Sequence, residues 1–329
     1  MKIYLLTLMI SVVFWACSSQ SVSEKQPVIL DTDANNELDD QHAIAYLLFN
    51  GDEFEVEGIT VNRTNNGGDI HEQAQEAQRV VRLCSLQGVV SVTKGADGSF
   101  TEIRDQLDQP DFDGADAVNL IIEKAHEIKG RKLLLLPVGK LTNIALALEK
   151  DPAIIPKVKV LWLGSNYPKP GEYNQVNDEP SVNAVLESRV EFEIVLVRYN
   201  EPSGTDAVRA TLEEIRTNMP GAGPEIAEPV TGRHGGEFTC FGDYSVDLFE
   251  HIDLHGEPPS RALFDMAAVA IAKNPAWAQP DTIPAPILVN GEWQERPNND
   301  RKIVIWEQFD REAIMTDFYD TMENYQLIE

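Results

Sequence analysis

Residues 27–49 read PVILDTDANNELDDQHAIAYLLF, and this stretch decides the fold. Val28–Leu30 has the apolar character of a buried parallel strand, and His42–Phe49 has that of a largely buried helix. Five acidic residues lie in or between these segments: Asp31, Asp33, Glu37, Asp39 and Asp40. A strand, an acidic turn and a helix in this order predict an α/β fold with a ligand site at the carboxyl end of the strand.

The acidic cluster has two interpretations. Several carboxylates held together repel one another unless a hard cation neutralises them, and ligand sets made only of oxygen favour Ca²⁺ or Mg²⁺ over zinc. The alternative is an acidic helix N-terminus with a solvated first turn, which would account for Asp39 or Asp40 alone. The cluster as a whole favours the metal site.

Apolar strand-like runs alternate with helix-like segments over most of the chain. This βα alternation predicts a doubly wound, mainly parallel sheet in a single domain with helical insertions. The expected strands are 28–30, 54–61, 133–138, 158–163, 192–197 and 303–306, and the expected helices are 39–49, 70–86, 116–129, 142–149, 182–189, 262–273 and a C-terminal one. Residues 202–259 are rich in glycine, proline and polar residues, so short helices or a lid are expected there.

The N-terminus has the pattern of an export signal. Lys2 is followed by the apolar run Ile3–Ala16 and then by Cys17, and residues 18–26 form a small polar tether. A small residue before the cysteine resembles a bacterial lipoprotein signal, in which Cys17 becomes lipidated; an ordinary secretory peptide or an uncleaved anchor remains the alternative. We expect residues 1–17 to be a signal segment, and residues 27–329 to form a domain exported to the periplasm or cell envelope.

Charge and cysteine content limit the function classes. The net charge of −27 leaves no basic surface for nucleic acid. Only Cys84 and Cys240 follow Cys17. Cys84 lies among apolar residues of an expected helix, and the sequence does not decide whether it pairs with Cys240.

Further polar groups follow other expected strands. Residues 62–68, NRTNNGG, follow one strand, although Asn-Gly is also ordinary turn chemistry. Gly139 would let a backbone carbonyl face a ligand. Asp265 lies among apolar residues and needs a partner or a metal, with a helix N-cap as the equal alternative.

Four of these segments together resemble the nucleoside hydrolase family, inosine-uridine preferring type. PVILDTDANNELDDQHAIAYLL resembles its Asp-x-Asp…Asp-Asp opening, and KLLLLPVGKLTNIALALEKDP its central strand and Gly-x-Leu-Thr-Asn stretch. WLGSN with EYNQVNDEPSVNAVLES, and RALFDMAAVAIAKNP, resemble two later segments in the expected order. The resemblance implies a doubly wound α/β sheet of nucleoside hydrolase type and calcium-dependent hydrolysis of N-glycosidic bonds, in ribonucleosides or a related pentosyl substrate. It also implies a homo-oligomer.

The resemblance carries roles onto individual residues. Asp33, Asp40, Asp265 and the Val138 carbonyl are the implied calcium ligands, and Asp39 is the implied general base. Asp31 is implied to lie behind these ligands or beside the ribose. The implied substrate-binding residues are Glu172, Asn174, Asn166 and Asn65, and Asn62 and Asn66 compete with Asn65 for its place.

Two departures from the family pattern stand out. Residues 34–38 form a loop two residues longer than usual. Phe264 occupies the place of the histidine that helps the leaving base depart, and phenylalanine donates no proton. His234, His251, His255 and Tyr244 are candidate replacements. A sugar- or nucleoside-binding lipoprotein without catalysis is therefore the alternative, and a phosphatase using the Asp-x-Asp pair ranks last, because no matching lysine motif is present.

Overall fold

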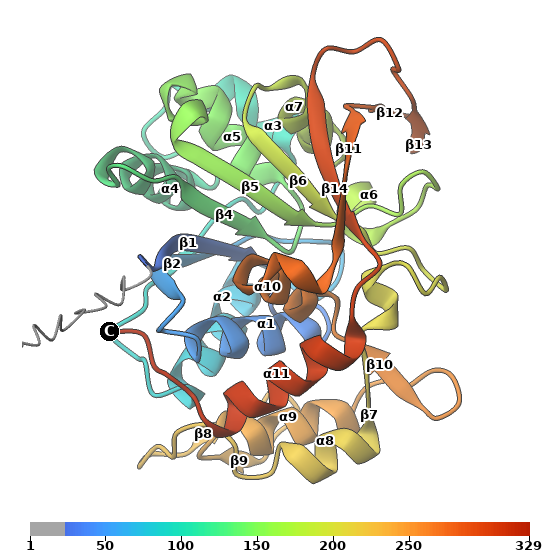
Figure 1. Cartoon of the computed structure of the whole chain (residues 1–329). Coiled ribbons are helices and arrows are strands. Elements are labelled where there is room, and N and C mark those ends of the chain that lie inside the picture. The colour runs from blue at the N-terminus through green and yellow to red at the C-terminus, as the bar shows by residue number, and fades with distance from the viewer. Residues whose placement is uncertain (1–23) are drawn as a thin grey trace, which may run out of the picture.

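The computed structural model describes residues 24–329, so the predicted signal segment and Cys17 lie outside the described residues. An eight-stranded sheet crosses the molecule (Figure 1). From one edge to the other its strands are β11 (Gln279–Pro284), β14 (Lys302–Glu307), β6 (Glu191–Val195), β5 (Val158–Leu163), β4 (Leu133–Pro137), β1 (Gln26–Thr32), β2 (Phe54–Val61) and β3 (Val92–Lys94).

Every neighbouring pair in this sheet is parallel except β11 with β14. The chain proceeds from β1 outward to β3 on one side and from β4 outward to β6 on the other. The predicted doubly wound, mainly parallel α/β fold is confirmed. The switch in direction lies between β1 and β4, which is where open sheets of this kind bind their ligands.

Helices cover both faces of the sheet. Figure 1 shows α1, α2, α10 and α11 below it and α3, α4, α5 and α7 above it. Their bounds are α1 (Asp39–Leu48), α2 (Ile70–Leu83), α10 (Phe264–Lys273), α11 (Arg311–Glu323), α3 (Phe100–Ile103), α4 (Ala115–Glu127), α5 (Thr142–Lys150) and α7 (Glu179–Glu187), with α6 (Tyr173–Asn177) between β5 and α7. Short 3₁₀ turns are η1 (Arg104–Gln106), η2 (Pro152–Lys157), η3 (Thr205–Ala207) and η4 (Pro275–Trp277).

The two layers enclose two hydrophobic clusters, and β1 contributes to both. Val28 and Leu30 pack with α1, α2 and α10, whereas Ile29 packs with α4, α5 and the β4 residue Leu133. Successive strand residues point to opposite faces, so a strand covered on both faces needs an apolar residue at every position. This explains why residues 28–30 are uninterrupted by polar side chains.

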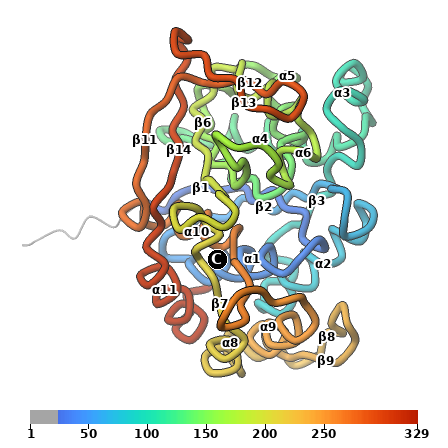
Figure 2. The backbone as a smooth tube through the Cα atoms, turned by 90° about the vertical axis from the view of Figure 1, so that its right-hand side faces the viewer, coloured from blue at the N-terminus to red at the C-terminus, as the bar shows by residue number. Residues whose placement is uncertain are grey.

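The region after β6 forms a separate layer at the base of the molecule, and Figure 2 shows α8 and α9 together there. It contains α8 (Leu212–Asn218), α9 (Phe241–Glu250) and the two-stranded pairs β7 (Arg209–Thr211) with β10 (Ser260–Ala262) and β8 (Val230–Thr231) with β9 (Glu237–Phe238). The short helices expected in residues 202–259 are confirmed.

Some boundaries differ from the predictions. The helix expected over residues 70–86 ends at Leu83, because the chain turns at Ser85 with a φ of 61°. The edge strand β11 and the hairpin of β12 (Ile287–Val289) and β13 (Glu292–Gln294) were not predicted. Most of β11 is exposed and it contains two prolines, so it lacks the apolar signal of a buried strand.

Within residues 24–329, no helix is both long and apolar enough to cross a membrane. Cys84 and Cys240 are buried and free, so the structure forms no disulfide between them.

Candidate active site

The carboxyl ends of three central strands meet at one edge of the sheet. Asp31 of β1 lies opposite Thr60 of β2 and Pro137 of β4. The backbone N–H of Val138 donates to the Asp31 carbonyl at 2.8 Å, which extends the pairing of β4 with β1 past the end of the strand. The residues that follow each strand therefore face a common space.

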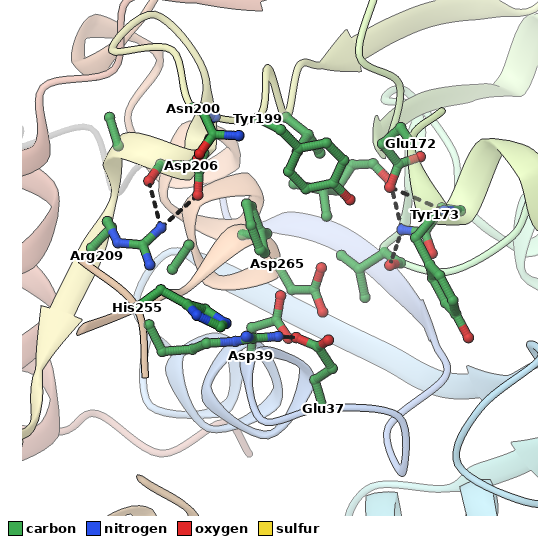
Figure 3. A pocket seen from close by; sticks show the side chains of 18 of the residues that line it. Glu37, Asp39, Glu172, Tyr173, Tyr199, Asn200, Asp206, Arg209, His255 and Asp265 are labelled. Carbon is green, nitrogen blue, oxygen red and sulfur yellow. Dashed lines mark hydrogen bonds and ion pairs between the residues drawn. The ribbon is translucent and has the colours of Figure 1, made fainter. Parts of the chain in front are cut away.

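This space is a cavity of about 680 Å³ (Figure 3). Seven predicted site residues line it: Asp33, Asp39, Asp40, Val138, Glu172, Asn174 and Asp265. They come from four separate segments of the chain, 33–40, 138, 172–174 and 265, which the sheet and helix α10 bring together. The structure thus places all four predicted metal-binding positions and the predicted base on one cavity.

Helix α1 fixes two of the carboxylates in its first turn. His42 anchors this helix: its Nδ1 lies 2.6 Å from the Leu38 carbonyl and its Nε2 lies 2.7 Å from Ser245 Oγ. Burial lowers the pKa of His42 to about 4, so the ring is neutral at pH 7. Asp40 accepts a hydrogen bond from Thr32 Oγ1 at the end of β1. The first turn of α1 is therefore attached to both the strand and the basal layer.

Asp39, Asp40 and Asp265 form a tight cluster of carboxylates. One oxygen from each lies within 4.8 Å of the others, and the three residues are only 6%, 2% and 3% exposed. Figure 3 shows Asp39 and Asp265 pointing toward each other. Asp33, which also lines the cavity, accepts a hydrogen bond from Thr64 Oγ1.

Burial and mutual repulsion disfavour ionisation of these carboxylates. Burial raises the pKa of Asp33 and of Asp39 to about 7. Burial followed by repulsion from neighbouring carboxylates raises the pKa of Asp40 and of Asp265 well above the ordinary value. Protons or a bound cation would relieve this repulsion.

The donor set fits a hard divalent cation. It consists of carboxylate oxygens and the Val138 carbonyl, which lines the same cavity, and no histidine or cysteine belongs to the cluster. Oxygen-only sets are typical of Ca²⁺ and Mg²⁺. The carbonyl already accepts a hydrogen bond from Asn174 Nδ2 at 2.7 Å, which leaves its second lone pair.

The structure corrects the substrate-side alternative for Asp31. This carboxylate is fully buried behind the cavity wall, where it accepts hydrogen bonds from Thr60 Oγ1 at 2.6 Å, Asn143 Nδ2 at 2.7 Å and Asn62 Nδ2 at 3.0 Å. Burial raises its pKa to about 6, and these three hydrogen bonds oppose the rise. Asp31 ties the ends of β1 and β2 to α5 and does not face the cavity.

Two asparagines predicted to bind substrate do not line the cavity. Asn65 is exposed in the loop after β2, and its backbone N–H donates to Asn177 Oδ1 at 2.7 Å. Asn62, its competitor, directly follows the strand and is the one turned inward, onto Asp31. Asn166 bonds the Pro170 carbonyl and the Tyr199 N–H, so it shapes the cavity wall indirectly.

Glu172 and Asn174 do line the cavity, as predicted. Glu172 caps helix α6: its carboxylate accepts the backbone N–H groups of Ser165, Asn174 and Gln175 at 2.8 to 3.0 Å. Asn174 donates its amide to two carbonyls, those of Val138 and Leu163. Both side chains are held rigidly beside the predicted metal ligands.

The lengthened loop of residues 34–38 changes the cavity wall. Asn35 fastens the loop, because its backbone N–H donates to Gln73 Oε1 and its Nδ2 donates to the Gly67 carbonyl. Glu37 enters the cavity and forms an ion pair with Arg261. The sequence flagged this loop as unusual but gave no sign of the arginine partner, which lies 224 residues away in sequence.

On the opposite wall, Phe264 packs edge-to-face against Tyr199 with ring centroids 5.9 Å apart. Of the four candidate replacements for the missing histidine, His255 lines the cavity. Tyr244 is buried elsewhere and donates to Glu76, and His234 and His251 face a neighbouring pocket.

Tyr199, Asp206 and Arg209 also line the cavity, although none of them was identified from the sequence. Asp206 and Arg209 form an ion pair at 2.6 Å in Figure 3. Asp206 lies in the short turn η3 and Arg209 starts the three-residue strand β7, and elements this short leave no periodicity in the sequence. Their charge makes this wall polar, in contrast to the aromatic pair beside it.

Gly139 provides a direct test of how tightly the site is packed. A methyl group at this position would lie 2.8 Å from Asp33 Oδ1 and 2.8 Å from Asn62 Nδ2, and both side chains are buried. We expect Gly139→Ala to displace Asp33, to lower the affinity for a divalent cation by about tenfold or more and to destabilise the fold by about 1–3 kcal/mol. Calcium titration by calorimetry measures the first effect and denaturant unfolding the second.

Gly98→Ala is the matched control, because its nearest neighbours lie 3.2 Å or farther from the added carbon. Calcium binding by Gly139→Ala with unchanged affinity would contradict the close approach of Asp33 to this backbone.

Comparison with known proteins gives a consistent result. The family model for inosine-uridine preferring nucleoside hydrolase matches residues 28–316. The curated enzyme of that name from Crithidia fasciculata is 24% identical over 294 residues, covering 80% of this chain and 84% of that protein. The one from Leishmania major is 24% identical over 281 residues, with the same coverage.

A solved plant nucleoside hydrolase superposes with a TM-score of 0.69 at 18% identity, covering 91% of this chain and 99% of that one. This likeness supports the fold. The family match spans nearly the whole described chain and includes every segment that lines the cavity. The chain therefore belongs to the inosine-uridine preferring nucleoside hydrolase family and is a hydrolase that acts on N-glycosidic bonds.

Proposed function

We propose that this chain hydrolyses the N-glycosidic bond of ribonucleosides, or of a related pentosyl substrate, in a calcium-dependent reaction. The observation that carries the proposal is the buried cluster of Asp39, Asp40 and Asp265, which shares one cavity with Glu172 and Asn174. Carboxylates that can hold a cation, beside polar groups that can bind hydroxyls, would suit hydrolysis of a sugar substrate.

Asp33, Asp40, Asp265 and the Val138 carbonyl would hold the calcium ion. When bound, the ion would neutralise the carboxylates, orient vicinal sugar hydroxyls and make a water more acidic. The oxygen-only donor set and the raised pKa values of these carboxyl groups support this assignment.

Asp39 would accept the proton of the attacking water. It is the most exposed of the three clustered carboxylates, and repulsion from Glu37 and attraction to Arg261 act on it in opposite directions. A nearby cation lowers the pKa of a carboxyl group, so Asp39 would be ionised at neutral pH and able to act as a base. The remaining carboxylates favour the positive charge that develops on the sugar.

Glu172 and Asn174 would bind sugar hydroxyls. The Asn174 amide nitrogen is engaged with two carbonyls, so its Oδ1 is the atom available to a hydroxyl donor. Glu172 Oε1 accepts one backbone N–H and keeps a further lone pair. Both groups are fixed before substrate arrives, which limits the entropy lost on binding.

A panel of nucleosides tests the proposal. Incubation of the protein with purine and pyrimidine ribonucleosides and calcium should release free ribose, measured as reducing sugar. Chelation with EDTA should stop the release, and added calcium should restore it. Absence of free sugar from every nucleoside and pentosyl donor, with calcium bound, would overturn the proposal.

Phe264 cannot donate a proton, so the leaving group of the substrate must depart without protonation from this position. We expect Phe264→His to raise kcat/KM for purine nucleosides by about tenfold or more, because a general acid contributes about 10²–10⁴ in favourable cases. Steady-state kinetics with inosine and uridine measures the change. Phe264→Leu is the control for lost contact with Tyr199 and should give no gain. An equal gain with both variants would argue against proton donation.

A binding protein without catalysis is the second candidate, and Phe264 is the observation that favours it. Calorimetry with ribose and nucleosides distinguishes the two functions. Tight calcium-dependent binding of an intact nucleoside, without free sugar after prolonged incubation, would establish the binding function in place of hydrolysis.

We also propose that the protein is exported and anchored through a lipid on Cys17, and that it forms homo-oligomers. The apolar run before Cys17 and the polar tether after it support the anchor. The full chain made in a bacterial host should partition into detergent, whereas Cys17→Ala should shift to the aqueous phase. Equal partitioning of both chains would contradict lipidation, and sedimentation velocity would give the assembly state.

A further inference from the structure

A second cluster of metal-binding side chains lies in the basal layer, away from the carboxylates. His234 belongs to the loop that joins β8 and β9, while Asp247 lies on α9 and His251 directly follows that helix. Asp247 and His251 are four residues apart, so the helix brings both side chains to the same face. The β8–β9 loop brings His234 to this face.

The distances in this cluster suit metal coordination. His234 Nδ1 lies 3.2 Å from Asp247 Oδ2, and His251 Nδ1 lies 3.3 Å from Asp247 Oδ1. Two ligands of a tetrahedral Zn²⁺ ion with bonds of about 2.0–2.1 Å are about 3.3 Å apart. The two imidazole rings stack with centroids 4.5 Å apart and planes inclined by 27°, and one ligand atom from each of the three side chains lies within 4.8 Å of the others.

We propose that His234, Asp247 and His251 form a binding site for a divalent transition metal of the zinc type. Two imidazole nitrogens and one carboxylate are the first three ligands, and water completes the coordination. Nitrogen donors favour zinc, nickel or copper, whereas the oxygen-only cluster in the active-site cavity favours calcium or magnesium. The chain would thus carry two cation sites of different chemical selectivity.

The charge state of the cluster supports binding. Burial lowers the pKa of His234, with the Arg233 charge acting in the same direction and Asp247 opposing it. The lowered pKa favours the neutral ring, which is the form that binds a metal. Asp247 forms no ion pair with a lysine or arginine anywhere in residues 24–329, and its carboxylate contacts the two histidine rings.

Access to the site is open. His234 and His251 line a pocket of about 280 Å³, and the His251 side chain is 48% exposed. His251 Nδ1 also lies 2.8 Å from the Asp247 backbone carbonyl, so on metal binding the neutral ring carries its proton on Nε2, or it turns.

A metal at this site would fasten the β8–β9 loop to α9. Arg233, next to His234, donates from Nη1 to the Glu37 carbonyl at 2.7 Å. Glu37 belongs to the lengthened loop that lines the active-site cavity. The metal would therefore stabilise the basal layer and, through Arg233, the wall of the active site.

Zinc titration of the full chain without an affinity tag tests the proposal. Saturating calcium keeps the carboxylate cluster occupied, and calorimetry then counts the remaining sites. We expect one Zn²⁺ per chain with a Kd below about 10 µM. His234→Ala and His251→Ala should each weaken zinc binding by about a hundredfold or more, because each removes one of three protein ligands.

His126→Ala is the matched control. His126 also bonds a carboxylate, with its Nε2 2.6 Å from Asp151, but Lys157 Nζ occupies the position of a second ligand at 2.6 Å from Nδ1. Zinc binding should be unchanged in this variant. Co²⁺ added in place of zinc should give the visible absorption of a four-coordinate nitrogen–oxygen site in the parent chain, and this signal should be absent from His251→Ala.

The outcomes separate clearly. One-to-one binding that both histidine variants lose and His126→Ala keeps would establish the site. Weaker binding by the parent, or zinc binding and a cobalt spectrum retained in His234→Ala and His251→Ala, would overturn it. Circular dichroism of each variant confirms that the fold is intact, so a loss of binding reports on the ligands.

Discussion

Asp39→Asn is expected to lower kcat by about a thousandfold while leaving calcium bound, since a positioned general base contributes about 10²–10⁴. Asparagine has nearly the same shape as aspartate but accepts no proton from water. Calorimetry with calcium, alongside single-turnover kinetics with the best nucleoside of the panel, measures both properties on one preparation. KM should change little, because Glu172 and Asn174 keep their positions.

Asp33→Asn is the informative comparison. Asp33 lines the same cavity, but its oxygens lie outside the 4.8 Å cluster formed by Asp39, Asp40 and Asp265. We assign Asp33 to the metal and Asp39 to the water, so Asp33→Asn should lose calcium affinity. If Asp39→Asn releases calcium while Asp33→Asn binds it without turnover, the two roles are exchanged.

Calcium affinity should fall by about a hundredfold or more between pH 8 and pH 6. Burial raises the pKa of Asp33 to about 7, and the pKa values of Asp40 and Asp265 are raised further. Protons therefore occupy the empty site at pH 6 and compete with the ion. Calorimetry in buffers of different ionisation enthalpy would also count the protons released.

The raised pKa values of these carboxyl groups also make the stability of the calcium-free protein fall as the pH rises. A carboxyl group with a raised pKa in the folded state contributes stability below its unfolded pKa of about 4, and this contribution is lost as the pH rises through about 7. The calcium-free protein should thus lose about 5 °C or more in Tm between pH 5 and pH 8, and calcium should restore it.

Asp40→Asn separates charge repulsion from metal binding. It removes one buried charge, so the calcium-free variant should be more stable than the parent at pH 8, and calcium should no longer raise its Tm. Differential scanning calorimetry with and without EDTA makes the comparison. A parent Tm independent of pH in EDTA would contradict a repulsive empty site.

The fold was largely predictable because its central strands are buried on both faces. The uninterrupted apolar run 133–138 and the mostly apolar run 158–163 coincide with β4 and β5 to within one residue. The edge strand β11 has neither buried face nor apolar run, and its pairing with β14 depends on tertiary contacts. Hydrophobic periodicity in a sequence indicates which residues are buried. It therefore does not reveal an exposed strand that is stabilised by pairing with a neighbouring strand.

The site was predictable where residues follow strands directly. Asp33, Asp39 and Asp40 lie within a few residues of β1, so their place follows from the fold. Asn65 shows where sequence-based prediction of the site fails. A motif does not determine which residue of the loop after a strand points into the site. In the structure Asn62 points inward and Asn65 lies at the surface. Arg261 and Tyr199 carried no local signal at all.

The cavity is built from two parts of the chain with separate duties. The carboxylates assigned to the cation and the water come from the turn after β1, from the start of α1 and from the start of α10, whereas Tyr199, Arg209, His255 and Arg261 come from the stretch between β6 and α10. This division would make the enzyme modular: the residues proposed to bind the cation and the sugar lie close to the central sheet, and much of the opposite cavity wall belongs to the stretch between β6 and α10. Exchange of residues 199–262 between homologues is therefore a rational route to new leaving-group preferences that leaves the chemistry of the sugar intact.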